Sequence, residues 1–365
     1  MSAMQDGNPD ALRRASFAEL DLADSFFDSL RRDYGPAFDE WFRRKAAADE
    51  PVWVMFSENG LSLEAMLYLK REDDDDAGVR PRLTKPRMKI GTFKVTSTHH
   101  TSIGKRMLAL ALREFARSGT AYIYVTMYDR GNTETLRRLL SQYGFRRIGD
   151  KKGYSGIESV WAKLRPTGPI DDPHAMFPFV TTAKGNSHIL AIWPKYHTRL
   201  FGDVKLQSER GVPVIDEVCA NTIEKIYLSG APGAADLNPG DHVVIYRTSD
   251  KLGPAQYRST VTSVCTVTGV RNISDFADKQ DFMAFIKGRS VFTDAELDEF
   301  WDKKRYPWVV SMLFNFPLDT YPTRKMLLDQ GLLDPNERIS CLPITQEAFK
   351  RIVRLGGTYE SYVVD

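Results

Sequence analysis

The sequence contains little cysteine, little histidine and no long apolar run. Its 365 residues include 3 Cys and 6 His. Cys219, Cys265 and Cys341 are too widely spaced for a disulfide framework or a paired-cysteine zinc site. The apolar runs fall far short of the roughly 20 residues of a membrane span, and the N-terminus lacks the apolar core of a signal peptide. We therefore expect a soluble, cytoplasmic protein with no metal site and no membrane partner.

The near-neutral total charge conceals an uneven distribution. The formal net charge is +2, yet residues 77–166 contain 19 Lys and Arg against 5 Asp and Glu. Such a local excess attracts phosphate-rich partners, either a nucleotide cofactor or a nucleic acid. The alternative is a solvated basic surface without a partner.

The hydrophobic pattern predicts an α/β domain over residues 1–166. Between Phe17 and Ala48 it predicts two helices broken near Gly35 and Pro36. A hairpin over 51–72 and a strand over 88–98 follow. An amphipathic helix over 102–119 is expected to end at Gly119. The remaining elements are a strand over 121–128, a helix over 133–145 and a closing hairpin over 146–164. This order is typical of an α/β fold.

A second, mostly β domain is predicted over residues 185–365. Residues 167–184 form the expected linker, because four prolines occur between residues 165 and 178. Strand candidates follow at 188–196, 222–229, 241–249 and 257–270, separated by turn signals such as "LNPGD". Helical stretches near 275–304, 322–331 and 345–355 are expected at the periphery.

The corner "STHHTSIGKRML", residues 97–108, joins a strand to a helix. A helix N-terminus has backbone N–H groups without an intrahelical partner and a partial positive charge, so it can bind an anion. Thr101 and Ser102 add hydroxyl groups, and Lys105 and Arg106 add charge, which predicts a phosphate site. In the alternative, Ser102 caps the helix and the two cations lie in solvent.

A metal site at the same corner is not predicted. His99 and His100 are adjacent, and adjacent side chains on an extended chain point in opposite directions. No His, Cys or carboxylate lies nearby at ligand spacing.

Two segments of the first domain resemble motifs of the GNAT acetyltransferases. "VTSTHHTSIGKRML" is similar to the loop that binds the acetyl-CoA pyrophosphate, with Gly104 at its last glycine, Ser102 at its first and His99 at its Gln/Arg position. "YDRGNTETLRRLLSQYGF" is similar to the family's strand-to-helix segment. The resemblance implies a mixed sheet flanked by helices and an acetyl-CoA-dependent acyltransferase. The cofactor-binding residues that it implies are Val95, Thr96, His99, His100, Thr101, Ser102, Ile103, Gly104, Lys105 and Asn132.

The catalytic residues that the resemblance implies are incomplete in this sequence. The family often uses a tyrosine to protonate the departing sulfur, and Leu140 stands at that position. Tyr143 and Tyr128 are the candidate substitutes, since the role requires only a hydroxyl within hydrogen-bond reach; alternatively, both are packing residues. No carboxylate lies on the third strand to act as a base, and Glu58 and Glu64 are weaker candidates. An α-amino acceptor, with a pKa of about 7.7 to 8.0, is then favoured over lysine.

The second domain resembles the PUA-like group, which includes ASCH and EVE modules. The likeness lies in the hairpin "LNPGDHVVIYRTSDKLGPAQYRSTVTSVCTV". It implies a small barrel that binds RNA or a modified base, through aromatic rings that stack and basic groups that reach phosphates. Alternatively, the aromatics fill the barrel core. The candidate nucleic-acid-binding residues are Trp193, Lys195, Tyr196, His197, Arg199, Tyr246, Arg247 and Arg258.

Together the two likenesses predict an N-acetyltransferase that uses acetyl-CoA and acts on an amine of a nucleic-acid-associated substrate. A modified base or an aminoacyl-tRNA would fit, with the second domain as the recognition module. The alternative is a non-catalytic reader of RNA or of a modified base, in which the acyl-CoA-binding domain is degenerate. Ser102 and Leu140 are the departures that favour this alternative. Nothing in the sequence identifies the acceptor, the acyl chain or the oligomeric state.

Overall fold

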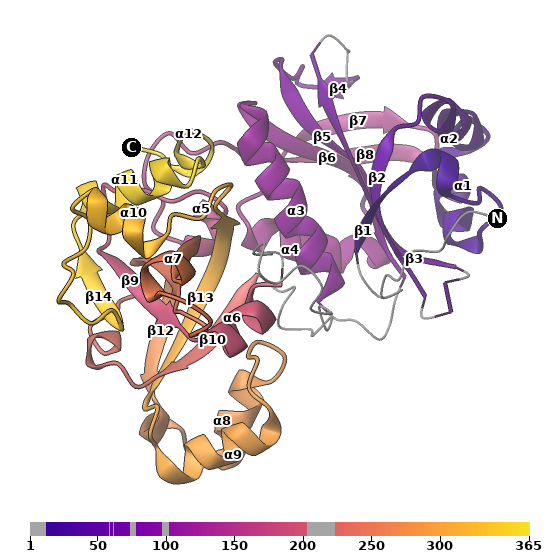
Figure 1. Cartoon of the computed structure of the whole chain (residues 1–365). Coiled ribbons are helices and arrows are strands. Elements are labelled where there is room, and N and C mark those ends of the chain that lie inside the picture. The colour runs from indigo at the N-terminus through magenta and orange to yellow at the C-terminus, as the bar shows by residue number, and fades with distance from the viewer. Residues whose placement is uncertain (1–11, 58, 61, 74–77, 97–101, 203–222) are drawn as a thin grey trace. The chain divides into compact units, whose positions relative to one another are not determined.

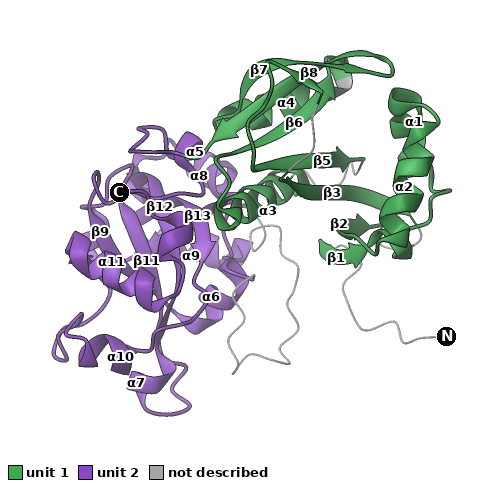
Figure 2. Ribbon diagram, turned by 90° about the horizontal axis from the view of Figure 1, so that it is seen from above, with its two compact units in different colours: residues 1–165 green, residues 166–365 purple. Residues whose placement is uncertain are grey.

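A computed structural model describes residues 12–57, 59–60, 62–73, 78–96, 102–202 and 223–365. The chain divides into two compact units, Met1–Arg165 and Pro166–Asp365 (Figure 2). Each unit contains a mixed β-sheet and several helices, so the predicted α/β class is confirmed.

The first unit is built on an eight-stranded sheet. Its strand order is β1-β2-β3-β5-β6-β8-β7-β4 (Figure 1). All neighbouring strands are antiparallel except β5 and β6, which are parallel. The bounds are β1 Arg13–Ser16, β2 Pro51–Phe56, β3 Leu63–Glu72, β4 Val79–Arg80, β5 Arg87–Val95, β6 Tyr122–Tyr128, β7 Arg146–Gly153 and β8 Gly156–Leu164.

Four α-helices pack on this sheet. Helices α1 (Asp28–Tyr34) and α2 (Ala37–Ala47) are separated at Gly35, which has a φ of +67°, as the sequence predicted. An aromatic cluster that includes Phe17, Phe27 and Phe42 joins them to β2 and β3. Helix α3 (Ile103–Ser118) packs on β3, β5 and β6, and the beginning of α4 (Glu134–Gln142) follows a short 3-10 turn, η3 (Gly131–Thr133). Gly119 ends α3 in the left-handed conformation, as expected.

The two parallel strands separate part-way along their length. They pair only from Met88 and Ile123 to Ile90 and Val125. Beyond this point β5 continues to Val95 against β3, and β6 continues to Tyr128 against β8. The sheet is therefore open between the second halves of β5 and β6.

The second unit contains a six-stranded sheet of order β10-β13-β12-β11-β9-β14. Strands β9 and β11 are parallel, and the other neighbours are antiparallel. The bounds are β9 Ser187–Ile192, β10 Glu224–Ser229, β11 His242–Arg247, β12 Thr260–Asn272, β13 Trp308–Pro317 and β14 Cys341–Ile344. The helices are α5 Pro173–Met176, α6 Pro194–Leu200, α7 Ala255–Arg258, α8 Lys279–Ile286, α9 Asp294–Lys303, α10 Arg324–Asp329, α11 Gln346–Leu355 and α12 Tyr359–Tyr362.

Two expectations for this unit are wrong. The sheet is not a closed barrel within the described residues, because no pairing joins β10 to β14; the N–H of Ile226 on β10 is instead donated to the carbonyl of Arg289, 2.7 Å away. The expected linker 167–184 is packed into the second unit, where Phe177 and Phe179 are fully buried and Val180 bridges Val363. The prolines restrict the backbone, but burial of the aromatic rings decides where the segment lies.

Candidate functional site

A cavity of about 1640 Å³ lies in the first unit where β5 and β6 separate. Residues of β5 and β6 line it at the opening. Helices α1 and α2 contribute residues that include Asp33, Tyr34 and Trp41, and α3 and α4 contribute residues that include Lys105 and Leu139. Such a concave site with charged groups along its walls is suited to bind a small molecule.

The beginning of α3 contains part of the predicted phosphate site. Val95, Thr96, Gly104 and Lys105 line the cavity, whereas Ile103 is buried. His99, His100 and Thr101 lie outside the described residues. A Cβ placed on Gly104 would meet only Leu139 Cδ2, at 3.6 Å, so the start of α3 lies against the second half of α4.

Ser102 does not cap α3 with its side chain. It occupies the N-cap position with helical backbone angles, φ −95° and ψ −11°, and its hydroxyl makes no capping bond. A side-chain cap requires an extended N-cap residue, which explains the absence. The first turn also contains no acidic residue that would compete with an anion. The structure therefore contradicts the capping alternative at Ser102.

The exposed edge of β5 presents peptide groups to the cavity. The N–H of Thr96 is donated to the carbonyl of Glu64 on the far side, at 2.8 Å. Backbone groups of successive strand residues point to opposite sides, so those of Val95 and Phe93 point toward the gap. This edge can therefore pair with an amide-containing ligand as another strand would.

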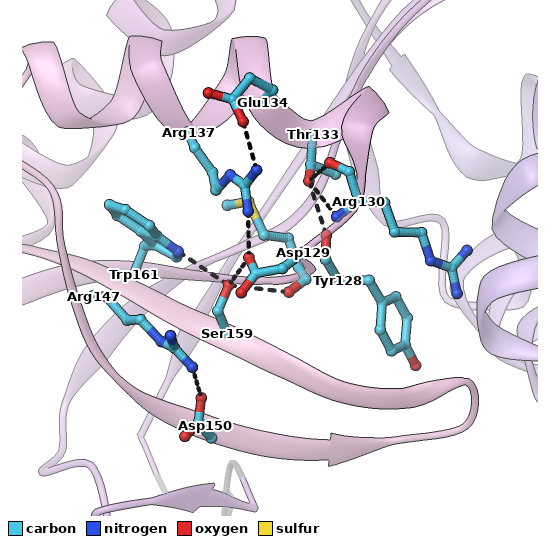
Figure 3. Close-up of polar contacts among 11 residues, drawn as sticks. Tyr128, Asp129, Arg130, Thr133, Glu134, Arg137, Arg147, Asp150, Ser159 and Trp161 are labelled. Atoms are coloured by element: carbon cyan, nitrogen blue, oxygen red, sulfur yellow. Dashed lines mark hydrogen bonds and ion pairs between the residues drawn. The ribbon is translucent and has the colours of Figure 1, made fainter.

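Tyr128 is the predicted catalytic residue that lines the cavity. It is the last residue of β6, and the corner after it is held by Thr133. The Oγ1 of Thr133 lies 2.9 Å from the carbonyls of both Tyr128 and Arg130, and it accepts the N–H of Arg130 at 3.2 Å (Figure 3).

A second set of bonds fixes the neighbouring Asp129. Its Oδ1 accepts from Arg137 Nη1 at 2.9 Å and from Ser159 Oγ at 2.8 Å. Trp161 Nε1 in turn donates to Ser159 Oγ at 3.1 Å. Figure 3 shows the Tyr128 ring pointing away from this network. The corner therefore orients the ring by constraining the backbone that follows it.

The surroundings of Tyr128 keep its hydroxyl protonated. Burial raises the pKa of Tyr128, and so do the negative charges of Glu158 and Asp33. The N–H of Ser155, which donates to Oη at 3.1 Å, and the nearby Arg130 act in the opposite direction but do not outweigh burial. A phenol with a raised pKa is neutral at pH 7 and can donate a proton.

Tyr143 does not share this position. Its side chain and that of Leu140 are fully buried, and neither lines the cavity. Tyr143 follows the last residue of α4, and its carbonyl accepts from Lys163 Nζ at 2.8 Å. The structure therefore contradicts a direct role for Tyr143, because its side chain does not line the cavity in which a substrate would bind.

The structure says less about the roles of the remaining candidate residues of the first domain, Asn132, Glu58 and Glu64. Asn132 lies in η3, but its side chain lies outside the described part of the chain. Glu58 is also outside the described residues, and Glu64 does not line the cavity.

Sequence reasoning missed Glu158, which also lines the cavity. The predicted strand began at Ser159, whereas β8 begins at Gly156 and places Glu158 opposite both Tyr128 and Lys151. Glu158 is 1% exposed, and its Oε1 lies 3.7 Å from Lys151 Nζ. Its Oε2 is buried and has no hydrogen-bond partner among the residues that the structure describes. A predicted strand that began three residues earlier, at Gly156, would have included Glu158, and the alternation of side chains along it could have indicated which face Glu158 occupies.

Sequence reasoning also missed a group of charges on the neighbouring strands. Lys89 Nζ lies 4.0 Å from Glu72 Oε1. The other oxygen of Glu72 accepts from Arg87 Nε at 2.7 Å and from Tyr124 Oη at 2.8 Å. Burial lowers the pKa of Lys89, and the positive charge of Lys151 lowers it further.

The second unit does not bring the eight predicted nucleic-acid-binding residues onto one surface. His197 is fully buried, and Tyr246 and Arg247 are 3% and 4% exposed. Bases stack only on accessible ring faces, so the predictions for these three residues are wrong. The prediction failed because Pro194 begins α6, which turns His197 toward the core.

The other candidates are accessible to different degrees. Trp193 is 66% exposed. Lys195 Nζ forms an ion pair with Glu296 Oε1 at 2.6 Å, and the Tyr196 hydroxyl lies 3.2 Å from the same oxygen. Arg258 is paired with Asp250 and lowers the pKa of that carboxyl to about 2. Arg199 is half-buried on α6.

Over the described ranges, no group of three or more His, Cys, Asp or Glu side chains is placed to hold a metal ion. In the same part of the chain, no helix has both the length and the apolar character needed to span a bilayer.

No family model matches the chain, and no curated protein matches it. Among solved structures, it is similar to ASCH from Zymomonas mobilis, with a TM-score of 0.30 and 9% identity over 47% of this chain and 95% of that chain. It is similar to an aminoglycoside 6'-acetyltransferase type Ii, with a TM-score of 0.28 and 17% identity over 43% of this chain and 100% of that chain. A third is human THYN1, solved with 5-methylcytosine-containing DNA, with a TM-score of 0.28 and 15% identity over 47% of this chain and 98% of that chain. At these scores and identities, none of the three assigns an activity to this chain.

Proposed function

We propose that this protein is an acetyl-CoA-dependent N-acetyltransferase that acts on an amine of a nucleic-acid-associated substrate. One observation carries the proposal: the parallel strands β5 and β6 separate over a cavity, and a protonated tyrosine, Tyr128, lines that cavity at the end of β6.

The residues present fit acetyl-CoA at three points. The N-terminus of α3, with Ser102 and Lys105, would hold the phosphates. The backbone groups of Phe93 and Val95 would pair with the amides of the pantetheine arm. Arg138 on α4, which lines the same cavity, would add positive charge. Acetyl-CoA, when bound, would supply the acetyl group as a thioester.

Two groups of this chain would then assist the transfer. A backbone N–H on the open edge of β5 would polarise the carbonyl as charge develops on its oxygen. Tyr128 would donate its phenolic proton to the sulfur that leaves. The proton that the amine nitrogen loses as it forms the new bond would pass to solvent, from which Tyr128 would be reprotonated.

The second unit would recognise the nucleic-acid part of the substrate. The exposed ring of Trp193 supports this role because it can stack on a base, and Arg199 lies on the short helix α6 that follows it. The net charge of residues 167–365 is −3, so binding would depend on base recognition more than on general attraction to phosphate.

A thiol-release assay with acetyl-CoA and fractionated cellular RNA and protein tests the proposal. We expect thiol release, together with acetyl-CoA binding that the Gly104→Glu substitution abolishes, since a carboxylate would then face the phosphates. Gly269→Glu is the matched control, because a Cβ on Gly269 meets no atom within 4 Å. Binding without thiol release would instead favour the non-catalytic reader, and equal binding by both variants would contradict the phosphate site.

A further inference from the structure

We propose that the acceptor binds as a zwitterion, with its ammonium group on Glu158 and an anionic group on Lys89 and Lys151. This inference rests on the proposed function, since it names the class of amine that the cavity accepts. The amine would therefore be primary, with a carboxylate or a phosphate a few bonds away.

Glu158 carries the argument for the ammonium group. It is a buried carboxylate in the wall of a cavity, and its Oε2 has no hydrogen-bond partner in the described structure. Leaving a buried carboxylate oxygen without a hydrogen bond carries the desolvation penalty of that group, so native proteins rarely do so without a reason. A cationic ligand would offset this cost through a charge-assisted hydrogen bond.

The position of Glu158 places that ligand beside Tyr128. A Cβ on Gly153 would come 2.6 Å from Glu158 Oε1 and 2.3 Å from Tyr128 Oη, so the carboxylate and the phenol approach the same point. The charge of Glu158 also raises the pKa of both Tyr34 and Tyr128. An ammonium group on Glu158 would therefore lie next to the hydroxyl that the proposed reaction uses.

The lysines on the adjoining strands carry the argument for the anionic group. Lys89 and Lys151 both line the cavity and lie close enough for each charge to act on the other. Lys89 Nζ lies 4.0 Å from Glu72 Oε1, which is too far for a hydrogen bond. The other carboxylate oxygen of Glu72 accepts hydrogen bonds from Arg87 and Tyr124. Two half-buried lysines that repel one another form a site that an anion stabilises.

The two halves of the site belong together. Lys151 lies 3.7 Å from Glu158 Oε1, and the charge of Glu158 also acts on Lys89. One small molecule can therefore contact all three side chains. An amine whose other end is uncharged would form a hydrogen bond with Glu158 but would leave the repulsion between the two lysines in place.

Isothermal titration with three probes tests the inference on the full chain without turnover. The probes are ethanolamine, phosphoethanolamine and β-alanine, which share a primary amine and differ in the group at the other end. We expect one of the two anionic probes to bind at least about tenfold more tightly than ethanolamine. If phosphoethanolamine is preferred, the anionic group is a phosphate, and if β-alanine is preferred, it is a carboxylate.

Two variants assign the halves of the site. Glu158→Gln should weaken all three probes by about tenfold or more, whereas Lys89→Met should remove only the preference for the anionic probe. Glu114→Gln is the control, since Glu114 is exposed on α3 and does not line the cavity. Thermal melting of each variant shows whether it folds, and Glu158→Asp should restore part of the lost affinity.

The outcomes separate this inference from the proposed function. Equal affinity for all three probes, or unchanged affinity in a folded Glu158→Gln variant, would overturn the inference even if acetyl-CoA binds. If the probes bind as expected but acetyl-CoA does not, the zwitterion site stands and the proposed function fails.

Discussion

Tyr128→Phe is the substitution that most directly tests how the cavity would work. It removes one oxygen, which accepts the N–H of Ser155 at 3.1 Å, and leaves the ring in place. Losing a single neutral hydrogen bond costs about 0.5–1.5 kcal/mol of folding free energy, so the variant should fold. Losing a general acid costs about 10²–10⁴-fold in rate, which corresponds to roughly 3–5 kcal/mol in the activation barrier.

The assay measures kcat by thiol release at saturating acetyl-CoA, and the dissociation constant of acetyl-CoA by titration. We expect kcat to fall by about 10²–10⁴-fold while the dissociation constant of acetyl-CoA stays unchanged. The reason is that the proposed role of Tyr128 is to protonate the departing sulfur, and other residues are proposed to hold the cofactor. Tyr122→Phe is the matched control: Tyr122 is on the same strand, is 5% exposed, and donates its hydroxyl to the carbonyl of Thr84. An equal fall in kcat for both variants would refute the reasoning.

The pH dependence of the wild type follows from the same geometry. The pKa of Tyr128 is raised above its ordinary value of 10.0, chiefly by burial. The proton donor is therefore present throughout the neutral range, and loss of activity through this group should begin only above pH 10. A loss between pH 7 and 9 that Tyr128→Phe removes would contradict the assignment.

The remaining predictions concern Gly153 and His197. Gly153→Ala should lower kcat without changing acetyl-CoA affinity, because the new methyl would press on Tyr128 Oη and Glu158 Oε1; Gly131→Ala, with no atom within 4 Å of its Cβ, is the control. Burial lowers the pKa of His197 to about 3, so the unfolded chain binds the extra proton first as the pH falls. Stability of the second unit, measured by urea unfolding, should therefore decrease from about pH 6.5 down to pH 3, and His197→Gln should flatten this slope. An unchanged slope in the variant would contradict a buried, neutral imidazole.

The sequence predicted the first unit well because its signals are local. The break at Gly35 and the stripe of α3 depend on spacing within a single helix, and both are present. The same reasoning missed β1 and β4, two short strands with too few residues to show a period. It also missed β13, although this strand lies inside its sheet and pairs with both β10 and β12.

The candidate site could be predicted only in part, because it depends on contacts between distant segments. The sequence singled out Tyr128 and the start of α3 as candidates, each from its position at the end of an element, and residues of both line the cavity. It could not choose between Tyr128 and Tyr143, since only tertiary packing buries one and lets the other line the cavity. Glu158 lies opposite Tyr128 through strand pairing, which no local spacing reveals.

The same limit explains the errors in the second unit. The resemblance to PUA-like domains implied that aromatic and basic residues of 192–258 bind a nucleic acid, with packing of the aromatics in the core as the alternative. The structure instead uses His197 and Tyr246 in the core and pairs Lys195 and Arg258 with acidic partners. Trp193 remains an exposed aromatic candidate.

Titration of the full chain with acetyl-CoA tests the central claim most directly. The account predicts saturable binding at one site per chain, and loss of that binding in Gly104→Glu but not in Gly269→Glu. If a folded wild-type chain showed no saturable binding of acetyl-CoA, the central claim would be contradicted, because the opening between β5 and β6 would then not be an acetyl-CoA site.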